Sequence, residues 1–174
     1  LLPLAIVCCM QAQNIHMALR PDDLLIDNFE GDTFGNWILE GNAFGNSPVS
    51  MERLSIWGDN RVEGNRMASS FVNGDAGTGV LKSPLFRIER RYVNFLIGGG
   101  VDYQREYVAL WIDGKEVKRS TGYNRRVMEY ESWDVAEYMG KNARIVLVDQ
   151  SKEGWGFINA DCFYQSDTKL EKEI

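Results

Sequence analysis

Apolar and polar side chains alternate most clearly along residues 107–112. Aliphatic residues occupy every second position, so they share one face of an extended strand, and Trp111 falls on the opposite face. Asp113-Gly114 follows directly, and this dipeptide suits a type I′ turn because both of its residues adopt positive φ. The segment therefore predicts a tight hairpin between strands 107–112 and 115–120.

The same two-residue period recurs in short segments separated by glycine-rich turns. No long amphipathic helix lies between them, which argues against a doubly wound α/β fold. Only Val135–Met139, followed by Gly140, suits one helical turn closed by a glycine. The pattern predicts an all-β, antiparallel β-sandwich. Its remaining strands are expected at Leu25–Phe29, Trp37–Glu40, Met67–Val72, Tyr92–Ile97, Val127–Trp133, Arg144–Val148 and Phe157–Tyr164.

The two ends of the chain differ in composition from the middle. Residues 1–12 are uncharged and nearly all apolar, too short to span a bilayer, and typical of the hydrophobic part of a secretory signal. A buried strand is the alternative interpretation. The small Ala12 would suit cleavage, which predicts a protein that is secreted, periplasmic or on the cell surface. Residues 13–23 are expected to form a linker, 24–165 the β-sandwich domain, and 166–174 a linker or truncated end.

The cysteines and the histidine restrict the chemistry further. Cys8 and Cys9 leave lipid attachment open as an alternative to cleavage. If that segment is removed, Cys162 remains alone, so no intrachain disulfide forms and no zinc-ligand spacing is present. Cys162 is expected to be a small apolar strand residue. The single histidine, His16, lies in the linker, which makes histidine-based acid–base catalysis improbable.

Composition agrees with a β-rich globular domain. The 174 residues include 17 Gly, 4 Pro and 11% aromatics, typical of a turn-rich β protein. Lys and Arg number 19 against 25 Asp and Glu, for a net charge of −6. An acidic chain lacks the basic surface that nucleic acids and anionic membranes require, so neither is an expected partner.

Two carboxylates stand out as candidate metal ligands. Glu30 lies at the end of the first expected strand and Asp161 lies inside the last. Chain ends often lie close together, so these strands are candidate neighbours. A carboxylate within an apolar strand needs a partner or a cation. The two residues are therefore candidate ligands of a structural calcium ion.

Exposed aromatic and polar loop residues are the candidate ligand-binding groups. Trp155 lies between two glycines in an expected loop, which would leave its ring accessible. Tyr103 and Arg105 follow the glycine triplet, and Asp75 lies in another turn-rich segment. Sugar recognition needs flat aromatic faces for the apolar side of the ring and polar groups for its hydroxyls. Core packing is the alternative role for each aromatic.

Several blocks, taken together, resemble a known module. They are DNFEGDTFGNWILEGNAFG, NGDAGTGVLKSPLFRIERRYVNFLIGGG, LWIDGKEVKRSTG, ESWDVAEYMGKNARIVLVDQ and GWGFINAD. In order and spacing they are similar to the accessory domain that precedes the catalytic domain in levanase-type family 32 glycoside hydrolases of Bacteroides-like bacteria. The resemblance covers about residues 26–164. It implies a jelly-roll, galactose-binding-like β-sandwich attached to a fructan-degrading enzyme, with Phe157 where a histidine commonly follows GWG.

The catalytic half of such enzymes is absent from this sequence. Their propeller carries WMNDPNG-, RDP- and EC-type motifs, and none occurs here. The expected function is therefore non-catalytic: a domain that binds fructan or another glycan beside a downstream catalytic domain. The alternative is a structural domain that docks on the propeller without binding sugar, which would require an exposed apolar patch.

Overall fold

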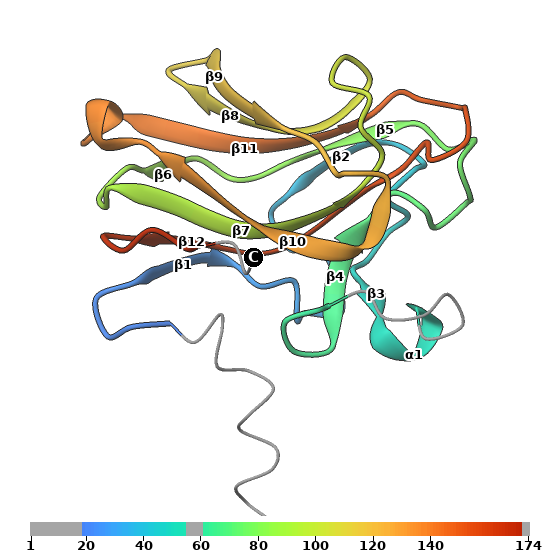
Figure 1. The fold of residues 1–174 in the computed structure, drawn as a ribbon, viewed down its shortest axis with the longest axis horizontal. Helices are drawn as coiled ribbons and strands as arrows, with labels where there is room; N and C mark the ends of the chain where they lie inside the picture. Colours follow the sequence, from blue (N-terminus) through green and yellow to red (C-terminus); the bar gives the residue numbers. More distant parts are fainter. Residues whose placement is uncertain (1–18, 55–60, 172–174) are drawn as a thin grey trace, which may run out of the picture.

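Two six-stranded antiparallel sheets pack face to face in the computed structural model (Figure 1). The structure describes residues 19–54 and 61–171. The expected signal segment, Cys8, Cys9 and His16 lie outside these residues. The all-β sandwich predicted from the alternation is confirmed, and its described strands run from Leu24 to Ser166.

One sheet, called sheet A here, is built around the last strand of the chain. Its β12 is flanked by β7 on one edge, while β1 and β4 share the other edge. Leu24 of the first strand pairs with Gln165 of the last, so the two ends of the domain are neighbours, as expected. The strands are β1 (Leu24–Asp27), β3 (Val49–Ser50), β4 (Arg66–Ser69), β7 (Tyr92–Gly99), β10 (Arg125–Asp134) and β12 (Ile158–Ser166).

The second sheet, sheet B, is centred on β11. It follows the order β2-β5-β11-β8-β9, and β6 pairs with the part of β11 that β5 leaves open. Its strands are β2 (Ile38–Gly41), β5 (Gly79–Lys82), β6 (Phe86–Arg87), β8 (Glu106–Ile112), β9 (Lys115–Ser120) and β11 (Asn142–Asp149). Two short helical segments, α1 (Met51–Leu54) and η2 (Ala136–Tyr138), complete the described elements.

The β8–β9 hairpin forms where the sequence predicts it. Ile112 pairs with Lys115, and φ is +49° at Asp113 and +80° at Gly114, as a type I′ turn requires. The single helical turn before Gly140 is also present. Strands β3, β5 and β6 were not expected, because they have two to four residues and, in β5, Leu81 is the one large side chain that is fully buried.

Aromatic side chains fill the space between the sheets. Phe95 stacks on Phe163, with ring centroids 4.8 Å apart, and meets the Trp133 ring at 4.5 Å. Burial of large rings in this way supplies much of the apolar free energy of a sandwich core. Cys162 is buried at a bulge in β12, and burial raises the pKa of its thiol, so it behaves as the apolar strand residue predicted.

Along the part of the chain that the structure covers, no helix is long and apolar enough to cross a membrane.

Candidate functional site

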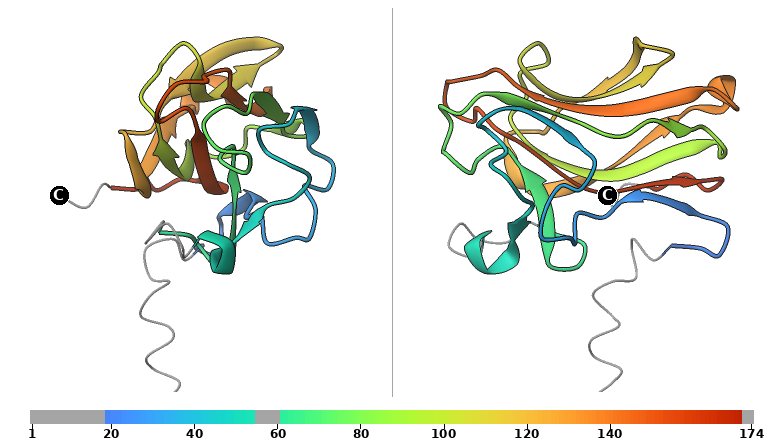
Figure 2. Two further views of the ribbon diagram at one scale, coloured as in Figure 1. Left: turned by 90° about the vertical axis from the view of Figure 1, so that its right-hand side faces the viewer. Right: turned by 180° about the vertical axis from the view of Figure 1, so that it is seen from behind.

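Three connections gather at one end of the sandwich and form what is called the loop end here. They are residues 70–78, 100–105 and 150–157, seen on the right of Figure 1 and facing the viewer in the left panel of Figure 2. The amide of Gln150 donates to the carbonyl of Arg105 at 2.6 Å, and the amide of Gly100 donates to that of Phe157 at 2.9 Å. All four predicted ligand-binding residues lie in these connections.

The two predicted aromatic residues of the loop end are exposed. Trp155 is 41% exposed, adopts φ of +62°, and stacks on the buried Phe157 with ring centroids 5.7 Å apart. A tryptophan in the left-handed region is unusual and is held there by its surroundings. Tyr103 is 58% exposed, and the Arg119 guanidinium lies over its ring and donates to its carbonyl.

The two predicted polar residues are already engaged by the protein. The Arg105 guanidinium pairs with Asp102 and with Glu153, the latter at 3.3 Å. Asp75 is half-buried. A Cβ placed on Gly156 would lie 2.8 Å from the carbonyl oxygen of Asp75, so the segment that contains Asp75 packs against the 150–157 connection. The loop end therefore brings the four residues together but leaves its arginine little freedom to bind a ligand.

A pair of buried carboxyl groups lies beneath the loop end. Glu106 on β8 is directly opposite Asp149 on β11, and both share the inward face of sheet B with core residues such as Leu110. Burial raises the pKa of Glu106 to about 7 and that of Asp149 to about 7, although hydrogen bonds from neighbouring groups oppose both shifts. The alternation of 107–112 extends back to Glu106, so the sequence contained a signal for a carboxyl group facing the core.

Glu30 and Asp161, the predicted metal ligands, both accept hydrogen bonds from one turn, residues 63–66. Glu30 accepts hydrogen bonds from the amides of Asn65 and Arg66, and Asp161 accepts them from the amides of Glu63 and Cys162. Burial, with the nearby charge of Glu30, raises the pKa of Asp161 well above its usual range. Backbone amides thus satisfy the carboxylate oxygens that were expected to require a cation.

No group of three or more Asp, Glu, His or Cys side chains within residues 19–54 and 61–171 is already arranged to hold a metal ion. Calcium at Glu30 and Asp161 stays a prediction.

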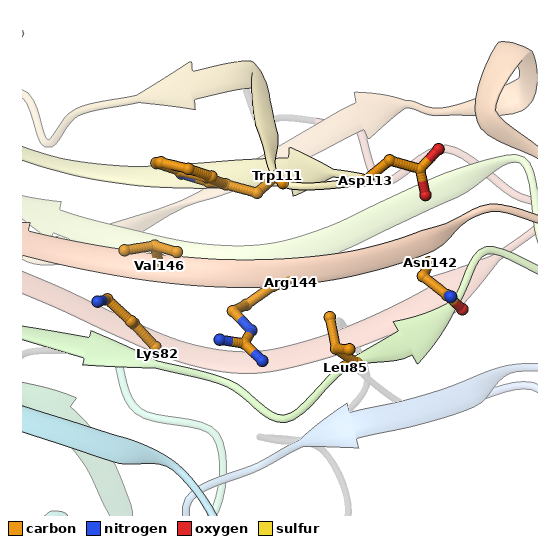
Figure 3. Close-up of a pocket in the computed structure, with 8 residues that line it drawn as sticks. Lys82, Leu85, Trp111, Asp113, Asn142, Arg144 and Val146 are labelled. Carbon is orange, nitrogen blue, oxygen red and sulfur yellow. The ribbon is translucent and has the colours of Figure 1, made fainter.

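The outer face of sheet B carries a second candidate site, which the sequence analysis did not select. Trp111 of β8, Arg144 and Val146 of β11, and Lys82 of β5 project from the same face of the sheet around a hollow of about 490 Å³ (Figure 3). Trp111 is 39% exposed, and its strand partner in β11 is Arg144. The alternation had already placed Trp111 away from the core face.

Polar groups surround the Trp111 ring on this face. Lys82 forms an ion pair with Glu40 at 2.8 Å, and Asn142 lies at the far end of the hollow. The Arg144 Nε is buried, and the described residues offer it no hydrogen-bond acceptor. The outer face of sheet B therefore combines an accessible aromatic ring with the guanidinium of Arg144, the ammonium of Lys82 and the amide of Asn142.

Comparison with curated proteins finds a related sequence. A relative from Aspergillus rugulosus, the putative glycosyl hydrolase ecdE, is 36% identical over 170 residues, or 94% of this chain. These residues make up 24% of that protein, so the chain spans about a quarter of its length. The relative is named a glycosyl hydrolase, but its name mentions neither family 32 nor fructan. No protein-family model matches the sequence.

Solved structures resemble this chain in fold. TmCBM61, determined in complex with β-1,4-galactotriose, has a TM-score of 0.52 at 18% identity and covers 79% of this chain and 92% of its own. The K1 cleaved adhesin domain of Lys-gingipain from Porphyromonas gingivalis W83 has a TM-score of 0.56 at 15% identity, over 84% of this chain and 98% of its own. A cyclase from Fischerella sp. TAU has a TM-score of 0.54 at 14% identity, over 82% and 96%. The fold is a galactose-binding-like β-sandwich.

Proposed function

We propose that this chain is the non-catalytic, carbohydrate-binding domain of a secreted glycoside hydrolase that acts on fructan. The related glycosyl hydrolase supports the enzyme association, and the fold shared with a protein solved in complex with a galactotriose supports glycan binding. The resemblance of the sequence blocks to levanase-type accessory domains is the argument for fructan. A tethered binding domain raises the local concentration of substrate beside the catalytic domain without adding any chemistry.

The hollow around Trp111 is the observation that carries this proposal. An exposed indole offers a flat apolar surface on which a sugar ring stacks. The guanidinium of Arg144, the ammonium of Lys82 and the amide of Asn142 line the same hollow and can donate hydrogen bonds to the sugar hydroxyls. All three come from rigid strands or their ends, so the site is held in place before ligand binding.

The loop end is the second proposed position for the same ligand. Trp155 and Tyr103 offer exposed rings there, and Arg105 and Asp75 are the proposed polar neighbours. We place it second because Arg105 would have to leave Asp102 and Glu153 before it could bind a sugar.

Hydrolysis by this domain is disfavoured by the placement of its carboxyl groups. A glycosidase needs two carboxyl groups that reach opposite sides of the scissile bond. The pair that the structure places face to face, Glu106 and Asp149, is 3% and 0% exposed. A substrate therefore does not reach them.

Docking on a catalytic domain is the rival function for the same face. Leu85 is 62% exposed and Ile38 is 49% exposed, and both belong to the sheet-B side of the molecule. These side chains would suit an apolar contact with another domain of the same polypeptide.

Calorimetry on the wild-type chain with levan, inulin and β-1,4-galactan would test the proposal. We expect binding of a fructan, and we expect Trp111→Ala to weaken it by about 1–3 kcal/mol because a stacking surface is lost. Trp155→Ala is the matched control, and we expect it to weaken fructan binding less than Trp111→Ala does. If Trp155→Ala weakened binding more than Trp111→Ala, the glycan site would lie at the loop end. No heat with any polysaccharide would favour docking, and release of reducing sugar would contradict both functions.

A further inference from the structure

Three carboxylate oxygens are buried beneath the loop end without a hydrogen-bond donor. They are Asp75 Oδ1, Glu106 Oε2 and Asp149 Oδ2, and none of them accepts a hydrogen bond within the described chain. The whole side chains of Glu106 and Asp149 are at least nine-tenths buried. Buried polar groups are normally paired, so three unpaired anionic oxygens in one region require an explanation.

Two of the three groups, Glu106 and Asp149, face each other. Glu106 and Asp149 are cross-strand partners that point to the same side of sheet B, where directly opposite side chains are about 5 Å apart. The charge of Asp75 contributes to the raised pKa of both partners, so all three carboxyl groups interact. They come from three separate segments that only the fold brings together.

Backbone oxygens complete an oxygen-rich environment. A Cβ placed on Gly100 would lie 1.9 Å from Glu106 Oε1 and 2.3 Å from the carbonyl oxygen of Trp155. The carboxylate of Glu106 and the Trp155 carbonyl therefore approach each other closely, and only a glycine at position 100 permits it. The guanidinium of Arg105, also in the loop end, pairs with Asp102 and Glu153 instead.

We propose that Glu106 and Asp149, joined by Asp75, bind a divalent cation inside the loop end, and that this cation is Ca²⁺. Ca²⁺ prefers carboxylate and carbonyl oxygens in a flexible arrangement, which are the groups present. The three carboxylates are not already closed around one point, so the ion draws Asp75 toward the other two. Glu106 and Asp149 each accept one amide hydrogen bond and keep one buried oxygen without a donor, whereas at Glu30 and Asp161 both oxygens of each carboxylate accept amide hydrogen bonds.

Thermal unfolding of the whole chain, without glycan, tests this proposal. We expect Ca²⁺ to raise the Tm and a chelator to lower it, because an ion that binds only the folded state stabilises it by mass action. Glu106→Gln and Asp149→Asn should each weaken the apparent Ca²⁺ affinity by more than about tenfold. Glu40→Gln, the control on the outer face of sheet B, should leave it unchanged.

Two outcomes would overturn the proposal. One is a wild-type Tm that does not respond to Ca²⁺. The other is a response that Glu30→Gln abolishes while Glu106→Gln retains it, which would place the ion at Glu30 and Asp161. Since no sugar is present, neither outcome depends on the proposed glycan binding.

Terbium luminescence provides a readout that does not require the Glu106 and Asp149 variants to fold. Tb³⁺ substitutes for Ca²⁺, and a nearby indole sensitises its emission. We expect wild-type protein to show emission that Ca²⁺ displaces, and Trp155→Phe to lose most of it while keeping the Tm response to Ca²⁺. Undiminished emission from Trp155→Phe would contradict the placement beneath Trp155.

Discussion

The loop end and the outer face of sheet B both present an exposed tryptophan, but the two regions differ in how far their polar groups are already engaged by other groups of the protein. At the loop end, Arg105 is held in ion pairs and the carboxyl groups beneath it are buried. On the outer face, Lys82 is also paired, with Glu40, but the Arg144 Nε beside Trp111 has no hydrogen-bond acceptor among the described residues. Exposure of an aromatic ring is therefore a weaker guide to a ligand site than the availability of the polar groups around it.

This difference predicts that stability depends on the interior of the loop end far more than on the outer face. Gly100→Ala should have the largest effect, about 3 kcal/mol of unfolding free energy, because the new methyl group would overlap Glu106 and the Trp155 carbonyl. Gly154→Ala is the matched control in the same end, with no atom within 4 Å of its Cβ, and should change stability little. Chemical denaturation of both variants measures the contrast, and equal losses would refute it.

The pH dependence of stability should reflect the buried carboxyl groups with raised pKa values, the Glu106–Asp149 pair and, in the same direction, Asp161. Burial raises the pKa of Glu106 and Asp149 from their usual values near 4 to about 7, so the folded state binds protons that the unfolded state releases. In chelator, stability should fall as pH rises from about 4 to 7, by about 1.4 kcal/mol per pH unit for each extra proton bound.

Denaturation series across this pH range would measure the slope. Glu106→Gln should flatten the profile, and saturating Ca²⁺ should reduce the decline because the ion takes the place of the protons. A profile that rises from pH 4 to 7 in chelator would contradict this account.

The smallest expected effect on stability belongs to the outer face. Trp111→Ala removes a ring that is 39% exposed, so the unfolding free energy should change by about 1 kcal/mol or less. Binding should nevertheless weaken, as set out above. A loss of stability as large as that of Gly100→Ala would mean that Trp111 is part of the core and would undermine its assignment to a ligand site.

Local signals in the sequence were sufficient to predict most of the longer strands and the β8–β9 hairpin. Alternation along 107–112 and the Asp113-Gly114 turn specify β8 and β9 because both depend only on neighbouring residues. Strand β5 escaped prediction because it is short and owes its place to pairing with β2 and β11. Pairing between distant strands leaves no period in a four-residue segment.

The sequence by itself determined the β-sandwich class, the position and turn type of the β8–β9 hairpin, and the residue types available for binding. Only the tertiary structure decided which of them meet. Asp75, Glu106 and Asp149 are far apart in the chain, and their approach depends on the order and register of β5, β8 and β11. The same register aligns Trp111 with Arg144 on the opposite face. Alternation assigns a side chain to a face, but only strand pairing supplies its neighbours.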